Sequence, residues 1–148
     1  MRNLLSLFFI SWACCFITLA EAKYDKFNPD SKCQFKQDDL CIVVNFENGI
    51  SRKNDSPFEI KFTEKKKAVL NKPELKLWMV MKNGHGHGSE TLAIKAADKK
   101  FAVSNAWFMM MGQWSIEGSI KAEGKVYNFS LPVCVGRTAS ESHLGECR

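Results

Sequence analysis

Two stretches of this sequence carry the side chains best suited to chemistry. The first, residues 75–88, contains Met79 and Met81 followed by His85 and His87, which are two of only three histidines in the chain. The second, residues 108–114, contains three consecutive methionines at 109–111. Imidazole nitrogen and thioether sulfur both bind copper, and thioether favours Cu(I). These residue types therefore indicate a copper site, provided that the fold brings the two stretches together.

The candidate metal ligands are His85, His87 and Met111, with Met81 as a fourth. Glycines flank both histidines, and they allow the backbone to approach a partner closely. Met81 is the strand methionine nearest to the histidines. Met111 lies beside Gly112, so we expect it at the rim of the domain while its two methionine neighbours pack inward.

A competing interpretation needs no metal. In it the histidines belong to a mobile polar glycine loop between strands, and the methionines fill the core. Met79 shares one face of its strand with Leu75 and Leu77, so we expect it to pack in the core. Trp107, Phe108 and Trp114 are likewise expected in the core.

The elements that must position these residues are short β-strands. Apolar and polar residues alternate in several runs separated by turn residues, and no segment shows a helical period over ten or more positions. The sequence therefore predicts an all-β protein, a two-sheet antiparallel immunoglobulin-like sandwich of about seven strands. The expected strands are 41–47, 58–63, 75–82, 91–96, 101–108, 115–121 and 126–131, the last of them closed by Pro132.

The N-terminus has the pattern of a secretory signal. Arg2 precedes a largely apolar run over residues 4–19, and Ala20 and Ala22 supply the small residues that a signal peptidase recognises. We expect a cleavable signal peptide at 1–22, an irregular lead-in at 23–40, a sandwich domain at 41–134 and a polar tail at 135–148. No stable transmembrane span would remain after cleavage. The expected location is exported, in the periplasm or cell envelope, with lipid attachment at Cys14 or Cys15 as the alternative.

Four cysteines lie beyond the signal, namely Cys33, Cys41, Cys134 and Cys147. In an exported domain they predict two disulfides, and their spacing matches no zinc motif. Local closure within each terminus costs the least chain entropy, but the spacing also permits pairing between the two termini.

Charge and motifs exclude several function classes. The formal net charge is +5, and the lysines mostly alternate with apolar residues, as on the solvated face of a sheet. A basic groove with interleaved aromatic residues would predict nucleic-acid binding, and the sequence shows no such pattern. The sequence lacks the G-x-S-x-G and H-E-x-x-H motifs, so we expect no enzyme activity.

The order of these motifs resembles the YtkA-like/FixH-like domain family. The resemblance covers about residues 58–131: a strand with Met-x-Met, then His-Gly-His-Gly, a strand, Phe-x-Val-x-Asn-x-Trp-Phe-x-Met-x-Gly-x-Trp, and a final hairpin. It implies a small β-sandwich of the cell envelope, in some members linked to copper handling or cytochrome oxidase maturation. The expected partners are copper-trafficking or respiratory-oxidase assembly proteins.

Carried over by position, the resemblance points to His85, His87, Met109 and Met111, together with Gly112 and Trp114. Two departures from the family favour a YtkA-like protein over an oxidase-assembly subunit. The proline often found near the methionine before the histidines is missing, and the leader has the features of a cleavable signal rather than a membrane anchor.

The leading hypothesis is an exported copper-binding protein for buffering or delivery. The alternative is a metal-free interaction or scaffold module of the envelope, with Trp107 and the methionine cluster as a binding patch.

Overall fold

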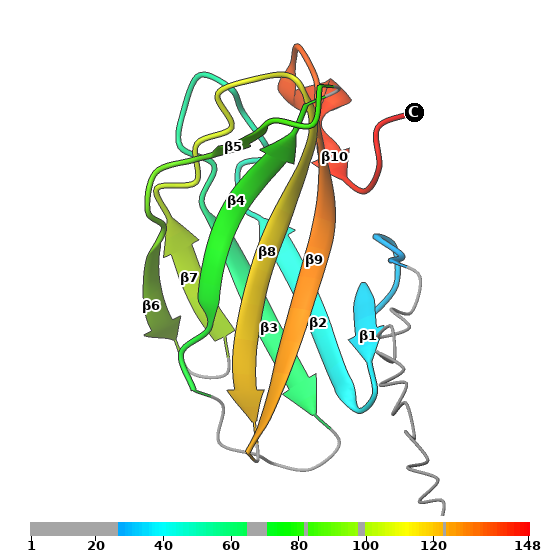
Figure 1. Ribbon diagram of the computed structural model, residues 1–148, viewed down its shortest axis with the longest axis vertical. Helices are drawn as coiled ribbons and strands as arrows, with labels where there is room; N and C mark the ends of the chain where they lie inside the picture. Colours follow the sequence, from blue (N-terminus) through cyan, green and yellow to red (C-terminus); the bar gives the residue numbers. More distant parts are fainter. Residues whose placement is uncertain (1–26, 65–70, 82, 98–99, 123) are drawn as a thin grey trace, which may run out of the picture.

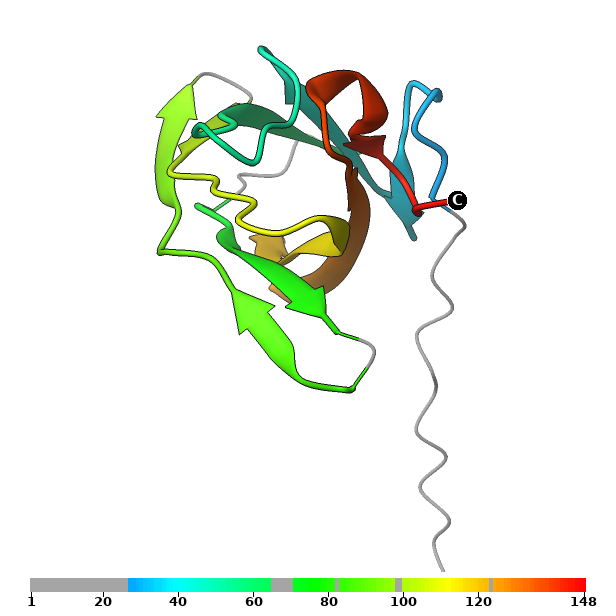
Figure 2. The same cartoon turned by 90° about the horizontal axis from the view of Figure 1, so that it is seen from above.

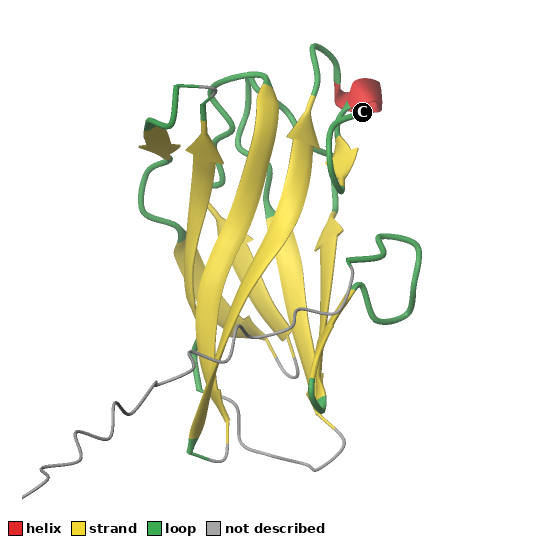
Figure 3. Ribbon diagram, turned by 45° about the vertical axis from the view of Figure 1, so that its right-hand side comes forward, coloured by secondary structure: helices red, strands yellow, loops and turns green. Residues whose placement is uncertain are grey.

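Two five-stranded antiparallel sheets pack face to face in the computed structural model (Figure 1), which confirms the predicted β-sandwich. The structure describes residues 27–64, 71–81, 83–97, 100–122 and 124–148, and strands make up most of the domain (Figure 3). The expected signal peptide at 1–22, with the alternative lipid sites Cys14 and Cys15, lies outside the described residues.

Each sheet combines strands from distant parts of the chain. The first sheet contains, in spatial order, β1 (Phe35–Gln37), β2 (Leu40–Phe46), β3 (Phe58–Glu64), β7 (Lys100–Ser104) and β6 (Ala93–Ala97). The second contains β10 (His143–Leu144), β9 (Lys125–Val135), β8 (Gly112–Ala122), β4 (Glu74–Val80) and β5 (Gly86–Gly88). One short 3-10 helix, η1 (Ala139–Glu141), precedes β10.

Seven of the ten strands in the described part of the chain are five or more residues long, and they correspond to the seven predicted strands. The other three are β1, β5 and β10, with three, three and two residues. All three lie at sheet edges. Such short edge strands carry too little alternation to be recognised in a sequence, and short edges also limit unwanted pairing with other chains. β1 falls inside the expected irregular lead-in, and β10 inside the expected polar tail.

Two predicted strand boundaries are wrong for identifiable reasons. β7 ends at Ser104 rather than Phe108, because Asn105 adopts a φ of 66°, in the left-handed region. β9 runs through Pro132 to Val135. The carbonyl of Pro132 accepts a hydrogen bond from the Gly145 N–H (2.8 Å), so the proline nitrogen also points away from β8 and costs that ladder no hydrogen bond.

The core lies between the inner faces of the two sheets. Phe62 of β3 meets Phe129 of β9 across the interface, with ring centroids 5.7 Å apart. At the end where β4 stops and β8 begins, called the upper end from here on, Phe108 and Trp114 pack edge to face at 5.5 Å. Both are fully buried, so this aromatic pair closes the upper end of the core.

Two local disulfides hold the terminal segments. Cys33 pairs with Cys41, and Cys134 pairs with Cys147, so each joins residues near each other in sequence. The second bond ties the tail to β9, beside the β9–β10 pairing. Two disulfides are compatible with an exported protein. None of the helical residues in the described ranges forms a segment long and apolar enough to cross a membrane.

Candidate metal centre

The histidine and methionine stretches lie at the same end of the sandwich. β4 runs upward to Val80, and β8 starts at the upper end with Gly112 (Figure 1). The register sets Met79 of β4 opposite Trp114 of β8. The segment that carries the methionine triplet leads directly into this start of β8, across the same end of the molecule (Figure 2).

The histidine segment includes a short strand, β5, rather than the mobile glycine loop of the competing interpretation. β5 pairs antiparallel with β4, with Met79 opposite His87, and the N–H of Met81 donates to the carbonyl of His85 (2.8 Å). The chain reverses just before, where the N–H of Gly84 donates to the carbonyl of Met81 (2.9 Å) and Gly84 has a φ of 82°. The only glycine that this turn requires is therefore Gly84, and the others serve a different purpose.

That purpose is to make room for Trp78. The indole of Trp78 lies against β5 on its outer side, so a Cβ on Gly86 would overlap the ring, and one on Gly88 would lie 3.4 Å from it. Successive side chains of a strand point to opposite faces, so the two histidines face away from the indole. The period-two alternation of glycine and histidine was the sequence signal for this strand.

Four potential donors consequently share one face of the β4–β5 hairpin. Met79 lies opposite His87, and the backbone pairing of Met81 with His85 continues the same alternation. Directly opposite residues have Cβ atoms about 5 Å apart. Residues two apart on one strand are separated by about 7 Å. Both histidines are exposed and both methionines are partly exposed, which suits a shared ion at the surface.

Met79 connects this face to the core. It packs against the buried cluster, as its position beside Leu77 predicts. Its terminal methyl lies 2.9 Å from the point where a Cβ on Gly112 would stand. Gly112 also has a φ of 124°, a conformation that favours glycine. The absence of a side chain at residue 112 thus lets Met79 reach toward the start of β8.

The methionine triplet divides into two exposed residues and one inward residue. Met109 is 57 % exposed and Met111 is 46 % exposed, whereas Met110 is partly buried against the core. The expectation of an exposed Met111 and an inward Met110 is confirmed, but the expectation of an inward Met109 is wrong. The indole N–H of Trp114 donates to the carbonyl of Met110 (2.9 Å) and holds the middle residue against the core.

Asp55 anchors the beginning of the methionine loop, residues 105–111, which connects β7 to β8 and carries the methionine triplet. Its carboxylate accepts hydrogen bonds from the N–H groups of Asn105 (3.0 Å) and Ala106 (2.6 Å), and the N–H of Ser56 donates to the carbonyl of Ala106 (3.0 Å). The sequence interpretation missed this role. An aspartate in a turn that can bind backbone N–H groups was the available signal, but its partners lie some fifty residues away in the chain.

The remaining aromatic residues and the third histidine differ in how they match their expected positions. Trp107 is only half-buried, and its indole N–H donates to Asn105 Oδ1 (3.4 Å), so the expectation of a core position is wrong for Trp107. It is correct for Phe108 and Trp114. His143 is exposed on β10, opposite Cys134 and separate from the β4–β5 hairpin.

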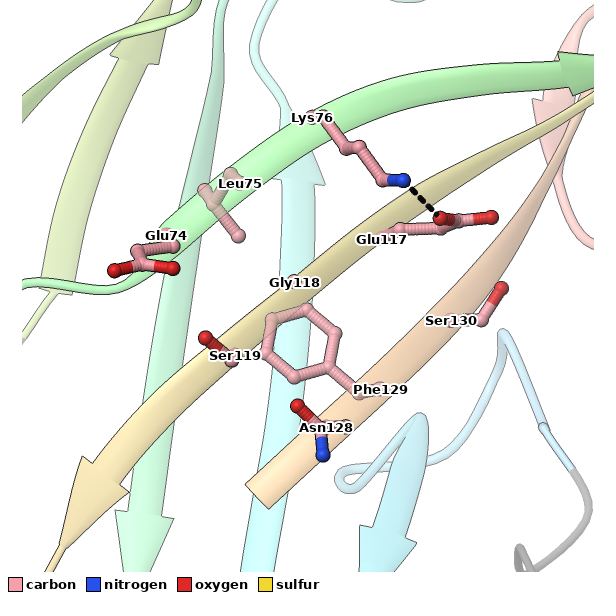
Figure 4. Close-up of a pocket in the computed structure, with 9 residues that line it drawn as sticks. All are labelled: Glu74, Leu75, Lys76, Glu117, Gly118, Ser119, Asn128, Phe129 and Ser130. Carbon is pink, nitrogen blue, oxygen red and sulfur yellow. Dashed lines mark ion pairs between the residues drawn. The ribbon is translucent and has the colours of Figure 1, made fainter. Parts of the chain in front are cut away.

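A shallow groove lies on the opposite, outer face of the second sheet (Figure 4). There the ammonium of Lys76 pairs with Glu117 Oε2 at 2.9 Å and lies 4.9 Å from the Trp78 ring centre. The groove is lined by Glu74, Leu75, Lys76, Glu117, Gly118, Ser119, Asn128, Phe129 and Ser130. It belongs to the lower half of β4 and is distinct from the histidine face.

The donor set at the upper end determines which metal chemistry it can support. Within the described ranges, no group of three or more histidine, cysteine, aspartate or glutamate side chains could hold a metal ion. The four described cysteines are in disulfides. Every methionine other than Met1 lies in the two stretches at this end. A metal held here by three or more side chains would therefore need thioether sulfur beside imidazole.

The chain matches no protein-family model, no curated protein and no solved structure. The resemblance to YtkA-like/FixH-like domains stays a prediction from the order of its motifs.

Proposed function

We propose that this protein is an exported, non-enzymatic β-sandwich that binds Cu(I) at its upper end. The proposed ligands are His85, His87 and Met81 of the β4–β5 hairpin, with Met111 from the neighbouring loop. Its role would be copper buffering or delivery in the periplasm or cell envelope.

One observation carries the proposal. β5 alternates glycine with histidine so that Trp78 covers the glycine side, and both imidazoles face the side shared with Met79 and Met81. A strand whose only role was to pack against the indole would not need imidazole at both positions that face away from it.

Ligand softness favours Cu(I) among the common metals. Thioether is a soft and weak donor that suits Cu(I), and imidazole binds both oxidation states of copper. Oxygen-seeking cations such as Ca²⁺ and Mg²⁺ would need carboxylates or carbonyls instead. With the cysteines held in disulfides, methionine is the sulfur ligand available in the described chain. The two imidazoles alone could hold Cu(II) more weakly.

Titration of the folded protein with Cu(I) against a competing chelator, under oxygen-free conditions, tests the proposal. The His85→Ala/His87→Ala variant should lose most of the affinity because half of the proposed ligands are removed. His143→Ala is the matched control, since it removes the exposed histidine on β10 and should leave the affinity unchanged. Equal affinity in the wild type and the double variant would remove the metal proposal.

One observation favours the metal-free interaction module as a second candidate. The upper end carries three large, exposed apolar side chains: Val80 at 62 %, Met109 at 57 % and Met111 at 46 %. Apolar groups gathered at one end of a domain are typical of a binding surface. Wild-type protein that folds but fails to compete for Cu(I) would favour this candidate.

A further inference from the structure

We propose that Met109 and Met111 form a modification site, at which a hydroperoxide converts each thioether to methionine sulfoxide. The intervening Met110 is protected and serves as an internal reference. Oxidation at these two residues does not depend on copper binding.

Solvent access separates the three consecutive methionines. Met109 and Met111 are about half exposed, at 57 % and 46 %, whereas Met110 packs against the core. Met79 also packs there. Oxidation of methionine requires that the oxidant reach the sulfur, so susceptibility follows exposure. The structure thus predicts that Met109 and Met111 react faster than the other three methionines at this end of the molecule, the partly exposed Met79, Met81 and Met110.

Hydrogen bonds fix both ends of the loop that exposes Met109 and Met111. Asp55 fixes the beginning of the loop through the N–H groups of Asn105 and Ala106. Near its end, the indole of Trp114 holds the carbonyl of Met110. Met109 and Met111 stand exposed on either side of the inward Met110 in the native state. Local unfolding is not needed to present them to an oxidant.

The reaction is a two-electron oxygen transfer. The thioether sulfur attacks the terminal oxygen of hydrogen peroxide, an S–O bond forms and the O–O bond breaks. Sulfur is oxidised, and the peroxide is reduced to hydroxide, which takes up the proton left by the transferred oxygen and departs as water. A methionine sulfoxide reductase, with a thiol reductant, reverses the change.

Oxidation would also regulate the proposed copper site, and this part of the inference rests on the proposed function. A sulfoxide is polar and no longer a thioether, so Met111 would lose its preference for Cu(I). Met81, His85 and His87 would remain. Oxidation should therefore weaken Cu(I) binding without abolishing it.

A peroxide time course on the folded, disulfide-bonded protein tests the site, with peptide mass mapping to locate each added oxygen. Residues 109 and 111 should each gain one oxygen several-fold faster than residues 79, 81 and 110. The Met109→Leu/Met111→Leu variant should lose the fast phase, and Met110→Leu should retain it. In denaturant the rates at all five of these methionines should become similar. Oxidation of Met110 as fast as its neighbours in the native protein would overturn the proposal.

A second measurement separates this inference from the copper proposal. After limited oxidation, Cu(I) affinity should fall in the wild type and stay constant in Met109→Leu/Met111→Leu. Unchanged affinity in the oxidised wild type would overturn the regulatory part alone. If the untreated protein binds no Cu(I), the proposed function and its regulation both fail, and the order of oxidation still decides the modification site.

Discussion

One face of β4 is buried in the core in the lower half of the strand and partly exposed in the upper half. In the lower half, Leu77 is 1 % exposed and lies opposite Ile116 of β8, which is fully buried. In the upper half, Met79 lies between Trp114 and the exposed His87, and Met81 follows just beyond Val80, where β4 ends. The side chains thus change from aliphatic to thioether as the strand leaves the core.

This difference shows how a candidate site can be built by extending a core face. Strand alternation keeps Met79 and Met81 on the side that Leu75 and Leu77 occupy, so the donors cannot turn away from the core side. Met79 and Met81 are more exposed than Leu77 because the neighbour on one side of this part of β4 is the short, exposed edge strand β5. The lower half should therefore determine stability, and the upper half should determine binding.

Leu77→Ala should have the largest effect on stability. Truncation of a fully buried leucine removes apolar burial and leaves a cavity, which costs about 2–5 kcal/mol in the free energy of unfolding. Met81→Ala, in the half-exposed upper part, should cost less than about 1 kcal/mol. Chemical denaturation of both variants measures the two values. Similar losses would show that the two halves of β4 do not differ.

Asp55→Ala should loosen the loop that carries the methionine triplet. It removes hydrogen bonds from a carboxylate to two backbone N–H groups, and such charge-assisted bonds contribute about 1.5–3 kcal/mol each, less where they are exposed to solvent. Hydrogen exchange should increase at residues 105–106 and remain unchanged in the lower half of β4. Uniform changes across both halves would contradict a local anchoring role.

Gly86→Ala should disturb the upper half alone. The new Cβ would overlap the Trp78 ring, and overpacking of this kind costs about 1–3 kcal/mol. Gly88→Ala is the matched control, because its Cβ would meet the ring at 3.4 Å and needs only a small adjustment. Trp78→Ala introduced into Gly86→Ala should relieve most of the clash. A double variant as unstable as the sum of the single variants would argue against this contact.

Met81→Leu should have little effect on stability but should weaken Cu(I) binding about tenfold, or about 1.4 kcal/mol, because it removes one thioether ligand. Met79→Leu is the comparison variant: it keeps an apolar side chain against the core and should change the Cu(I) affinity less. Both variants conserve volume, so each should cost under about 1.5 kcal/mol in stability. Chelator competition measures the affinities, and the reverse order would make Met79 the ligand.

Much of the fold could be read from alternation and turn residues, because those patterns are local. The seven longer strands and the inward positions of Phe108 and Trp114 follow from the sequence. The β5 strand was missed because glycine, with no side chain, hides the apolar alternation. The position of Met109 was misjudged because the Trp114 indole that holds Met110 inward comes from the following strand. The Asp55 anchor depends on a contact between distant turns, which no local pattern records.

The amino-acid sequence by itself determined that this chain forms a β-sandwich, and that its histidines and methionines concentrate in two segments. Those properties depend on residue type and on spacing within a few positions. The tertiary structure alone decided that the two segments meet at one end, that each disulfide closes locally and that His85 and His87 share one face of the hairpin with Met79 and Met81. The meeting of the two segments depends on the register between β4 and β8, which are distant in the sequence. The placement of the histidines depends on the register of the β4–β5 hairpin, in which the Trp78 indole lies against the glycines.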